Sequence, residues 1–94
     1  MTVNVKFIGA LRQISGKSKV TIETLNGKSI LELIEEISQK KPEMKKNLID
    51  TQLEDPKPNA LILVNGKEIS VLAGLATKLA DGDEVVFIPV VHGG

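Results

Sequence analysis

The residues whose types could support a chemical reaction lie at the end of the sequence. Two glycines, Gly93 and Gly94, follow closely on a predicted core strand. Neither has a side chain to pack, and glycine adopts backbone angles that are closed to other residues. A diglycine end is thin enough to enter a narrow tunnel in an enzyme and to present its carboxylate there, where adenylation would make it an acyl donor. On the glycines alone, this function and a frayed chain end are equally open.

No other residue type in the chain supports a catalytic or metal site. There is no cysteine, which excludes a thiol nucleophile, a disulfide and a thiolate metal site. The single histidine, His92, lies near the chain end, whereas a catalytic triad needs a fixed imidazole and a zinc site needs further ligands. Asp81, Asp83 and Glu84 lack the spacing of a calcium loop and are predicted to form a turn. We therefore expect no metal and no bound cofactor.

Length and charge narrow the class of partner. The 94 residues are enough for one domain, and 12 basic residues balance 12 acidic ones. A neutral chain lacks the electrostatic footprint of a nucleic-acid or membrane binder, and two Phe without Tyr or Trp offer few stacking platforms. The longest apolar run, residues 85–91, is far below the roughly 20 residues of a membrane span. We expect a cytoplasmic protein with neither nucleic acid nor membrane as a partner.

Two stretches near the N-terminus alternate apolar and polar residues, at positions 3–8 and 19–23. This period-two pattern predicts two strands that open the fold as a hairpin, with residues 9–18 as the connection. In the second strand, Val20 and Ile22 are expected to point inward.

A helix is predicted from residue 29 onward by its cap and its apolar spacing. Ser29 and Glu32 match a capping box. Four apolar side chains then recur at spacing i, i+3, i+4, i+7, which places them on one face: Ile30, Leu33, Ile34 and Ile37. Pro42 ends or offsets this helix, residues 43–49 are expected to make a short helical turn, and residues 50–58 a loop.

The second half of the chain contains two further strand patterns. Residues 59–64 form a continuous apolar run, which is typical of a central strand buried on both faces. The dipeptide at 65–66 is Asn-Gly, a hairpin signal, so residues 67–69 are predicted to begin a short return strand. Residues 84–91 form the last strand, in which Pro89 lacks an N–H donor and indicates weakened pairing or an edge position.

The predicted order is strand, strand, helix, strand, short strand, strand. One main helix on a mixed sheet of four to five strands is an α+β fold. No repeat, low-complexity tract or second core is visible, so residues 1–91 are expected to form one domain and residues 92–94 a flexible diglycine tail.

Three blocks, spread over nearly the full length, resemble the molybdopterin-synthase small-subunit branch of the MoaD/ThiS family of ubiquitin-like sulfur carriers. They are residues 5–12 with Gly16, residues 63–67, and residues 79–89 followed by the terminal diglycine. The resemblance implies a ubiquitin-like β-grasp fold. Family members often carry Pro-Pro after the last strand, where this chain has Pro89 and Val90, and a small residue before the diglycine, where it has His92. The long stretch 43–58 resembles archaeal small modifier proteins and the eukaryotic ubiquitin-related modifier.

The resemblance also implies an acyl-activation cycle at Gly94. An adenylating enzyme of the ubiquitin-activating type would use Mg-ATP to adenylate the Gly94 carboxylate, and sulfur from a persulfide enzyme would then displace AMP to give a thiocarboxylate. The tail, with His92 and Gly93, would enter the large subunit of molybdopterin synthase and donate sulfur in molybdenum-cofactor biosynthesis. In the alternative role, the activated Gly94 is joined to lysines of target proteins, and both roles use the same carboxylate. The catalytic side chains would belong to the partners.

The contact surface for those partners is expected to flank the tail. The candidates are the apolar residues of the last strand that the core does not use, and exposed apolar patches mark partner sites: Val86, Ile88, Val90 and Val91. For each of them, packing inside the core is an equally open alternative. A third hypothesis is a non-covalent β-grasp binding module whose tail is incidental, and removal of Gly94 distinguishes it from the other two.

Overall fold

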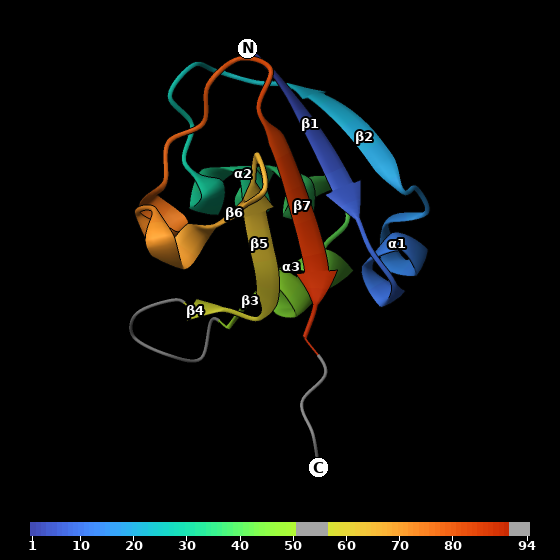
Figure 1. The fold of residues 1–94 in the computed structure, drawn as a ribbon. Helices are drawn as coiled ribbons and strands as arrows, with labels where there is room; N and C mark the ends of the chain where they lie inside the picture. The colour runs from blue at the N-terminus through green and yellow to red at the C-terminus, as the bar shows by residue number, and fades with distance from the viewer. Residues whose placement is uncertain (51–56, 91–94) are drawn as a thin grey trace.

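A mixed five-stranded sheet is the frame of the structure, a computed structural model that describes residues 1–50 and 57–90. The strand order is β2-β1-β7-β5-β6 (Figure 1). The strands are β1 (Thr2–Phe7), β2 (Lys19–Glu23), β5 (Ala60–Val64), β6 (Lys67–Glu68) and β7 (Glu84–Pro89). Strands β1 and β7 run parallel, and the other neighbours are antiparallel. A separate short pair joins β3 (Ile49–Asp50) to β4 (Lys57–Pro58).

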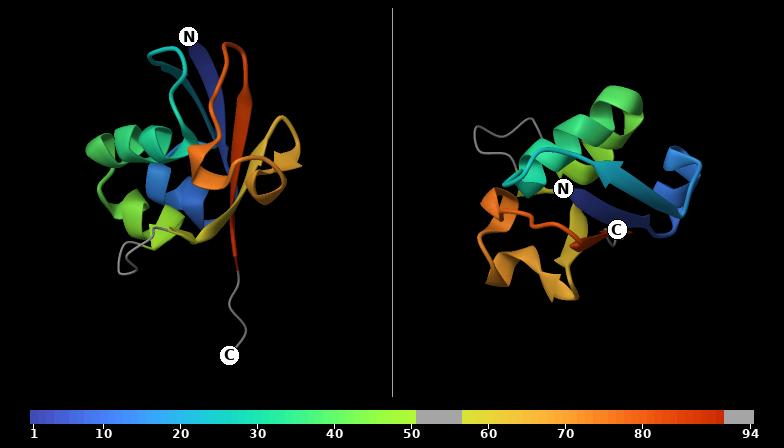
Figure 2. Two further views of the ribbon diagram at one scale, coloured as in Figure 1. Left: turned by 90° about the vertical axis from the view of Figure 1, so that its left-hand side faces the viewer. Right: turned by 90° about the horizontal axis from the view of Figure 1, so that it is seen from above.

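The three α-helices lie on one face of this sheet (Figure 2, left). They are α1 (Ala10–Ser15), α2 (Ile30–Lys40) and α3 (Glu43–Leu48), and two 3-10 turns follow at η1 (Ile69–Val71) and η2 (Gly74–Ala76). The expected α+β arrangement, with one main helix against a mixed sheet, is confirmed. No helix within the described ranges is long and apolar enough to cross a membrane.

The core forms between the helices and the inner face of the sheet. Successive strand side chains point to opposite faces, so every second residue of β1 and β7 meets the helices. Val5 of β1, Val85 and Phe87 of β7 and Ile62 of β5 are all at most 1% exposed. The four apolar positions predicted for the helix stripe are all buried, which confirms that spacing. The opposite, outer face of the sheet carries no α-helix (Figure 2, left).

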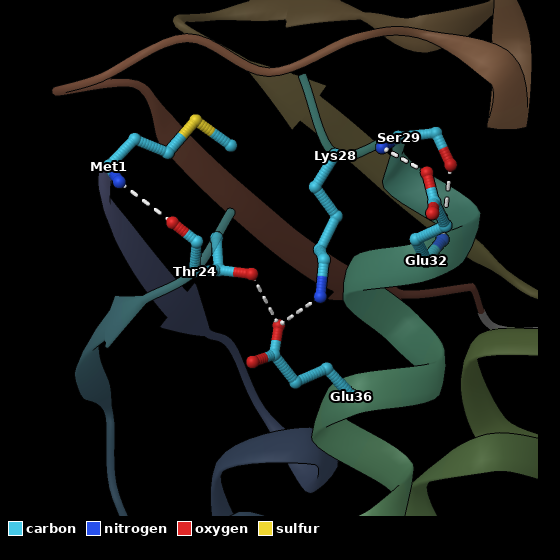
Figure 3. Close-up of polar contacts among 6 residues, drawn as sticks. All are labelled: Met1, Thr24, Lys28, Ser29, Glu32 and Glu36. Atoms are coloured by element: carbon cyan, nitrogen blue, oxygen red, sulfur yellow. Dashed lines mark hydrogen bonds and ion pairs between the residues drawn. The ribbon is translucent and has the colours of Figure 1, made fainter. Parts of the chain in front are cut away.

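The predicted capping box is present at the start of α2 (Figure 3). Ser29 Oγ accepts a hydrogen bond from the Glu32 backbone N–H at 3.1 Å, and Glu32 Oε1 accepts one from the Ser29 N–H at 2.9 Å. One turn further on, Glu36 Oε2 accepts hydrogen bonds from Lys28 Nζ at 3.1 Å and from Thr24 Oγ1 at 2.9 Å. The helix is therefore capped and tied to the chain segment that follows β2.

The cap makes stability depend on pH through Glu32. Its hydrogen bonds to the Ser29 backbone and side chain lower the pKa of the Glu32 carboxyl below its usual value. A lowered folded-state pKa contributes stability that is present above the unfolded-state value and is lost as pH falls through the folded-state value. In urea unfolding series across the acid range, we expect Glu32→Gln, which keeps the acceptor but does not titrate, to lose less stability on acidification than the wild type. Parallel losses in the two proteins would contradict this.

Two expectations need correction, and one of the two alternatives for Pro89 is borne out. The connection at residues 9–18 contains α1, a helix too short to show periodicity, which begins after Gly9 at φ 58°. For Pro89, the weakened pairing is confirmed and the edge position is not: Pro89 lies at the end of a central strand, its partner is Ala60, and the ladder stops there, so its missing N–H costs little. The apolar run of β5 is buried on one face only, because Leu61 is 37% exposed on the outer face.

Candidate functional site

The site expected from the sequence lies along β7 and the residues that follow it. Val86, Ile88 and Val90 fall within the structure. Four other predicted site residues lie outside the described residues: Val91, His92, Gly93 and Gly94. The part of the site that the structure describes is thus the strand that leads to the diglycine.

Strand β7 presents alternate side chains to opposite faces. Val85 and Phe87 are fully buried against the helices, whereas Val86 and Ile88 are half-buried on the outer face. Val90, just after the strand, is 48% exposed. The core therefore uses neither Val86 nor Ile88 fully, and these two side chains remain accessible on the surface without a helix.

Neighbouring strands add three apolar residues that the sequence analysis did not include. Across the β5–β7 ladder, Leu61 pairs with Ile88 and Leu63 pairs with Val86. On the other side, the Ile8 backbone N–H donates to the Phe87 carbonyl at 3.0 Å, which places Ile8, 45% exposed, beside the end of β7. We call the combined surface the apolar sheet face: Ile8, Leu61, Leu63, Val86 and Ile88. Val90 lies outside it and lines a hollow with residues of α1 and α3.

The end of β7 is held in place from two sides. Gly9 packs so closely on Pro89 that a Cβ at Gly9 would lie 3.2 Å from the proline Cγ. Asn59, at the start of β5, donates from its backbone N–H to the Leu48 carbonyl at 2.8 Å and from Nδ2 to the Lys46 carbonyl at 2.9 Å. These contacts anchor the strand ends to α3 and α1, so the point at which the chain leaves the sheet is fixed.

Charged side chains border the apolar sheet face, and Ile8 lines a hollow with Lys6, Arg12 and Lys19. Lys6 and Glu84 form an ion pair at 3.1 Å at the start of β7, and both side chains are more than a third exposed. Such a pair contributes little stability, and it marks the polar border of the apolar sheet face. In the ranges 1–50 and 57–90, no group of three or more His, Asp or Glu side chains is arranged to hold a metal ion. The described site is therefore suited to apolar contact with another protein.

Known proteins are similar to this chain over nearly its full length. The model of the ThiS family matches residues 5–94. The molybdopterin synthase sulfur carrier subunit of Mycobacterium tuberculosis is 34% identical, over 98% of this chain and 96% of its own length. The small archaeal modifier protein 1 of Methanosarcina acetivorans has a solved structure that is 30% identical, covers 99% of this chain and 96% of that one, and superposes with a TM-score of 0.80.

A third comparison concerns assembly. CysO in the BexX/CysO complex of Amycolatopsis orientalis is 26% identical, with 98% of this chain and 99% of that chain covered and a TM-score of 0.76. These neighbours carry the ubiquitin-like β-grasp fold that the resemblance implied, which confirms the fold expectation. The chain belongs to the ThiS family of ubiquitin-like sulfur carriers and modifiers.

Proposed function

We propose that this chain is a sulfur carrier whose Gly94 carboxylate becomes a thiocarboxylate, and that it donates this sulfur in molybdopterin biosynthesis as the small subunit of molybdopterin synthase. The observation that carries the proposal is the apolar sheet face, which is centred on β7, the strand that precedes the diglycine. A partner that covers this face contacts the strand from which the sequence continues to the diglycine. The 34% identical sulfur carrier subunit supports molybdopterin synthase as the acceptor.

The chemistry takes place on the carboxylate of Gly94. One carboxylate oxygen attacks the α-phosphorus of Mg-ATP in the adenylating enzyme, which forms the acyl adenylate and releases pyrophosphate. The terminal sulfur of a partner's persulfide then attacks the carbonyl carbon, and AMP leaves. A second thiol of the partner cleaves the sulfur–sulfur bond, so that the partner keeps a disulfide and Gly94 keeps the thiocarboxylate. All the cysteines must come from partners, because this chain has none.

A second function, protein modification, is favoured by the 30% identical small archaeal modifier protein. Here the Nζ of a target lysine attacks the activated carbonyl of Gly94, AMP or a thiol leaves, and an isopeptide bond forms. Trypsin cuts after lysine and arginine, and Lys78 is the last such residue in this chain, so a tryptic digest of modified proteins would yield target lysines that carry residues 79–94 as a branched remnant. Finding such remnants supports conjugation, and their absence under activating conditions assigns the chain to sulfur transfer alone.

The apolar sheet face offers a test of partner docking. Leu61→Lys places a charge in the middle of this surface, and we expect the KM for this protein in ATP–pyrophosphate exchange by its adenylating enzyme to rise about tenfold. Leu25→Lys is the matched control, since Leu25 is 77% exposed and lies outside the face. Both variants should unfold in urea as the wild type does. Equal kinetics for the two variants would show that the enzyme docks elsewhere.

A further inference from the structure

Strand β2 is one of the two edge strands of the sheet, and β6 is the other (Figure 1). Phe7 N–H donates to the Ser18 carbonyl and Thr24 N–H to the Met1 carbonyl, each at 2.9 Å, so the even-numbered residues of this stretch bond to β1. In an antiparallel pair, the residues between them turn their backbone groups away. The N–H and C=O groups of three residues therefore point out from the open edge: Lys19, Thr21 and Glu23.

A groove of 380 Å³ runs between this edge and α2. Val20 and Ile22 line it from β2 and Ile37 from α2. Both β2 side chains are on the helix side of the sheet, yet they are only half-buried, because the helix does not cover the outermost strand as it covers β1. The groove thus offers apolar contact directly beside backbone groups that have no strand partner within residues 1–50 and 57–90.

Charge is distributed unevenly along the groove. Lys17 precedes β2, Lys40 and Lys41 lie at the end of α2, and among the described residues none of the three forms an ion pair. The groove has two carboxylates. Glu23, at the far end of β2, accepts a hydrogen bond from the Thr2 hydroxyl. Glu36, one turn before Lys40 on α2, is paired with Lys28 Nζ at 3.1 Å and accepts a hydrogen bond from the Thr24 hydroxyl (Figure 3 shows Glu36). The C-terminal end of α2 carries a negative partial charge of about half an elementary charge. The positive charge of the three lysines exceeds it, so this part of the groove is net positive.

We propose that this groove binds an extended segment of another protein, which adds as an antiparallel strand to the β2 edge. The segment has β-branched apolar residues, which enter the groove over Val20, Ile22 and Ile37, followed by acidic residues beside Lys17, Lys40 and Lys41. Backbone hydrogen bonds give such strand addition its affinity, and the alternate side chains give it specificity. This surface is distinct from the apolar sheet face, and the proposal does not depend on Gly94 chemistry.

The test uses the full chain labelled with ¹⁵N and a synthetic peptide of alternating valine and isoleucine followed by three aspartates. We expect saturable amide shifts at Lys19, Thr21 and Glu23 and along the end of α2, with no change at Leu61 or Val86. A peptide with lysines in place of the aspartates should bind at least about tenfold more weakly. Equal binding of the two peptides, shifts confined to the apolar sheet face, or no shifts would overturn the proposal.

Variants separate the two parts of the recognition. Lys40→Glu combined with Lys41→Glu should weaken binding about tenfold, whereas Lys45→Glu with Lys46→Glu, the same charge change on α3, should leave it unchanged. Thr21→Pro removes an outward N–H without touching the ladder to β1, and it should abolish the shifts while circular dichroism stays that of the wild type. Undiminished binding by the Lys40/Lys41 variant would contradict the account even if Thr21→Pro failed to fold.

Two further measurements test whether a second copy of this chain occupies the β2 edge, and whether peptide binding depends on Gly94. Amide shifts at the β2 edge that grow with protein concentration in the absence of peptide would assign the edge to a second copy of this chain, against the proposal. Removal of Gly94 should leave peptide binding intact. The groove and the acyl-activation proposals can therefore fail separately.

Discussion

Deletion of Gly94 is expected to reduce ATP–pyrophosphate exchange by the adenylating enzyme at least about a hundredfold, because displacement of a reacting group by even 1 Å can cost that factor. The deletion leaves a carboxylate on Gly93, but this carboxylate stops up to about 3.6 Å short of its original reach. The folded core should be unaffected, since a terminal glycine has no side chain to pack.

The stability of the Gly94 deletion variant serves as the control for its exchange activity. Urea unfolding of the shortened protein should match that of the wild type within a few tenths of a kcal/mol, which is the usual effect of a surface change. The variant Gly94→Ala keeps the length of the chain. Its exchange activity measures whether the adenylating enzyme tolerates a Cβ at this position. Full exchange activity after deletion would favour the reading in which the domain binds non-covalently and the tail is incidental.

Replacement of Phe87 by alanine is expected to have the largest effect on stability. The side chain is fully buried at the centre of β7, and its ring stacks on that of Phe7 with centroids 5.7 Å apart and an interplanar angle of 15°. Truncation of a buried Phe costs about 3–5 kcal/mol, against a total of about 5–15 kcal/mol for a domain. At about 4–8 °C per kcal/mol, the Tm should fall by at least about 12 °C.

A conservative replacement provides the comparison. Phe87→Leu keeps most of the apolar volume and should cost clearly less than the alanine variant in the same thermal unfolding measurement. A Tm loss of only a few degrees for Phe87→Ala would show that β7 does not organise the core as described. The placement of the apolar sheet face relative to the core would then be in doubt as well.

Local patterns in the sequence were enough to predict the elements that have a capping motif or a regular apolar spacing. The cap at Ser29 and the four-residue apolar stripe of α2 lie within one helix, so no tertiary information was needed to predict them. Helix α1 was missed because its six residues span fewer than two turns and show only Leu11 and Ile14 in a helical spacing. Short elements such as this one are stabilised by packing, here the burial of Leu11.

The functional surface required information that a single sequence does not contain. Val86 and Ile88 could be proposed because they alternate with core positions along one strand. Ile8, Leu61 and Leu63 join them only through the parallel pairing of β1 with β7 and the register of β5 against β7. The uniformly apolar run of β5 concealed its exposed face, since Leu61 has the same side-chain character as its buried neighbours.

The intact mass of this protein, purified from the cell in which it is naturally made, is the most direct test of the central claim. If Gly94 is converted to a thiocarboxylate, a species heavier by about 16 Da appears, since one oxygen of the activated acyl group is replaced by sulfur. The extra mass should map to the C-terminal fragment and be absent when the adenylating enzyme is removed. A C-terminus that is never thiolated while that enzyme is present and active would contradict the account.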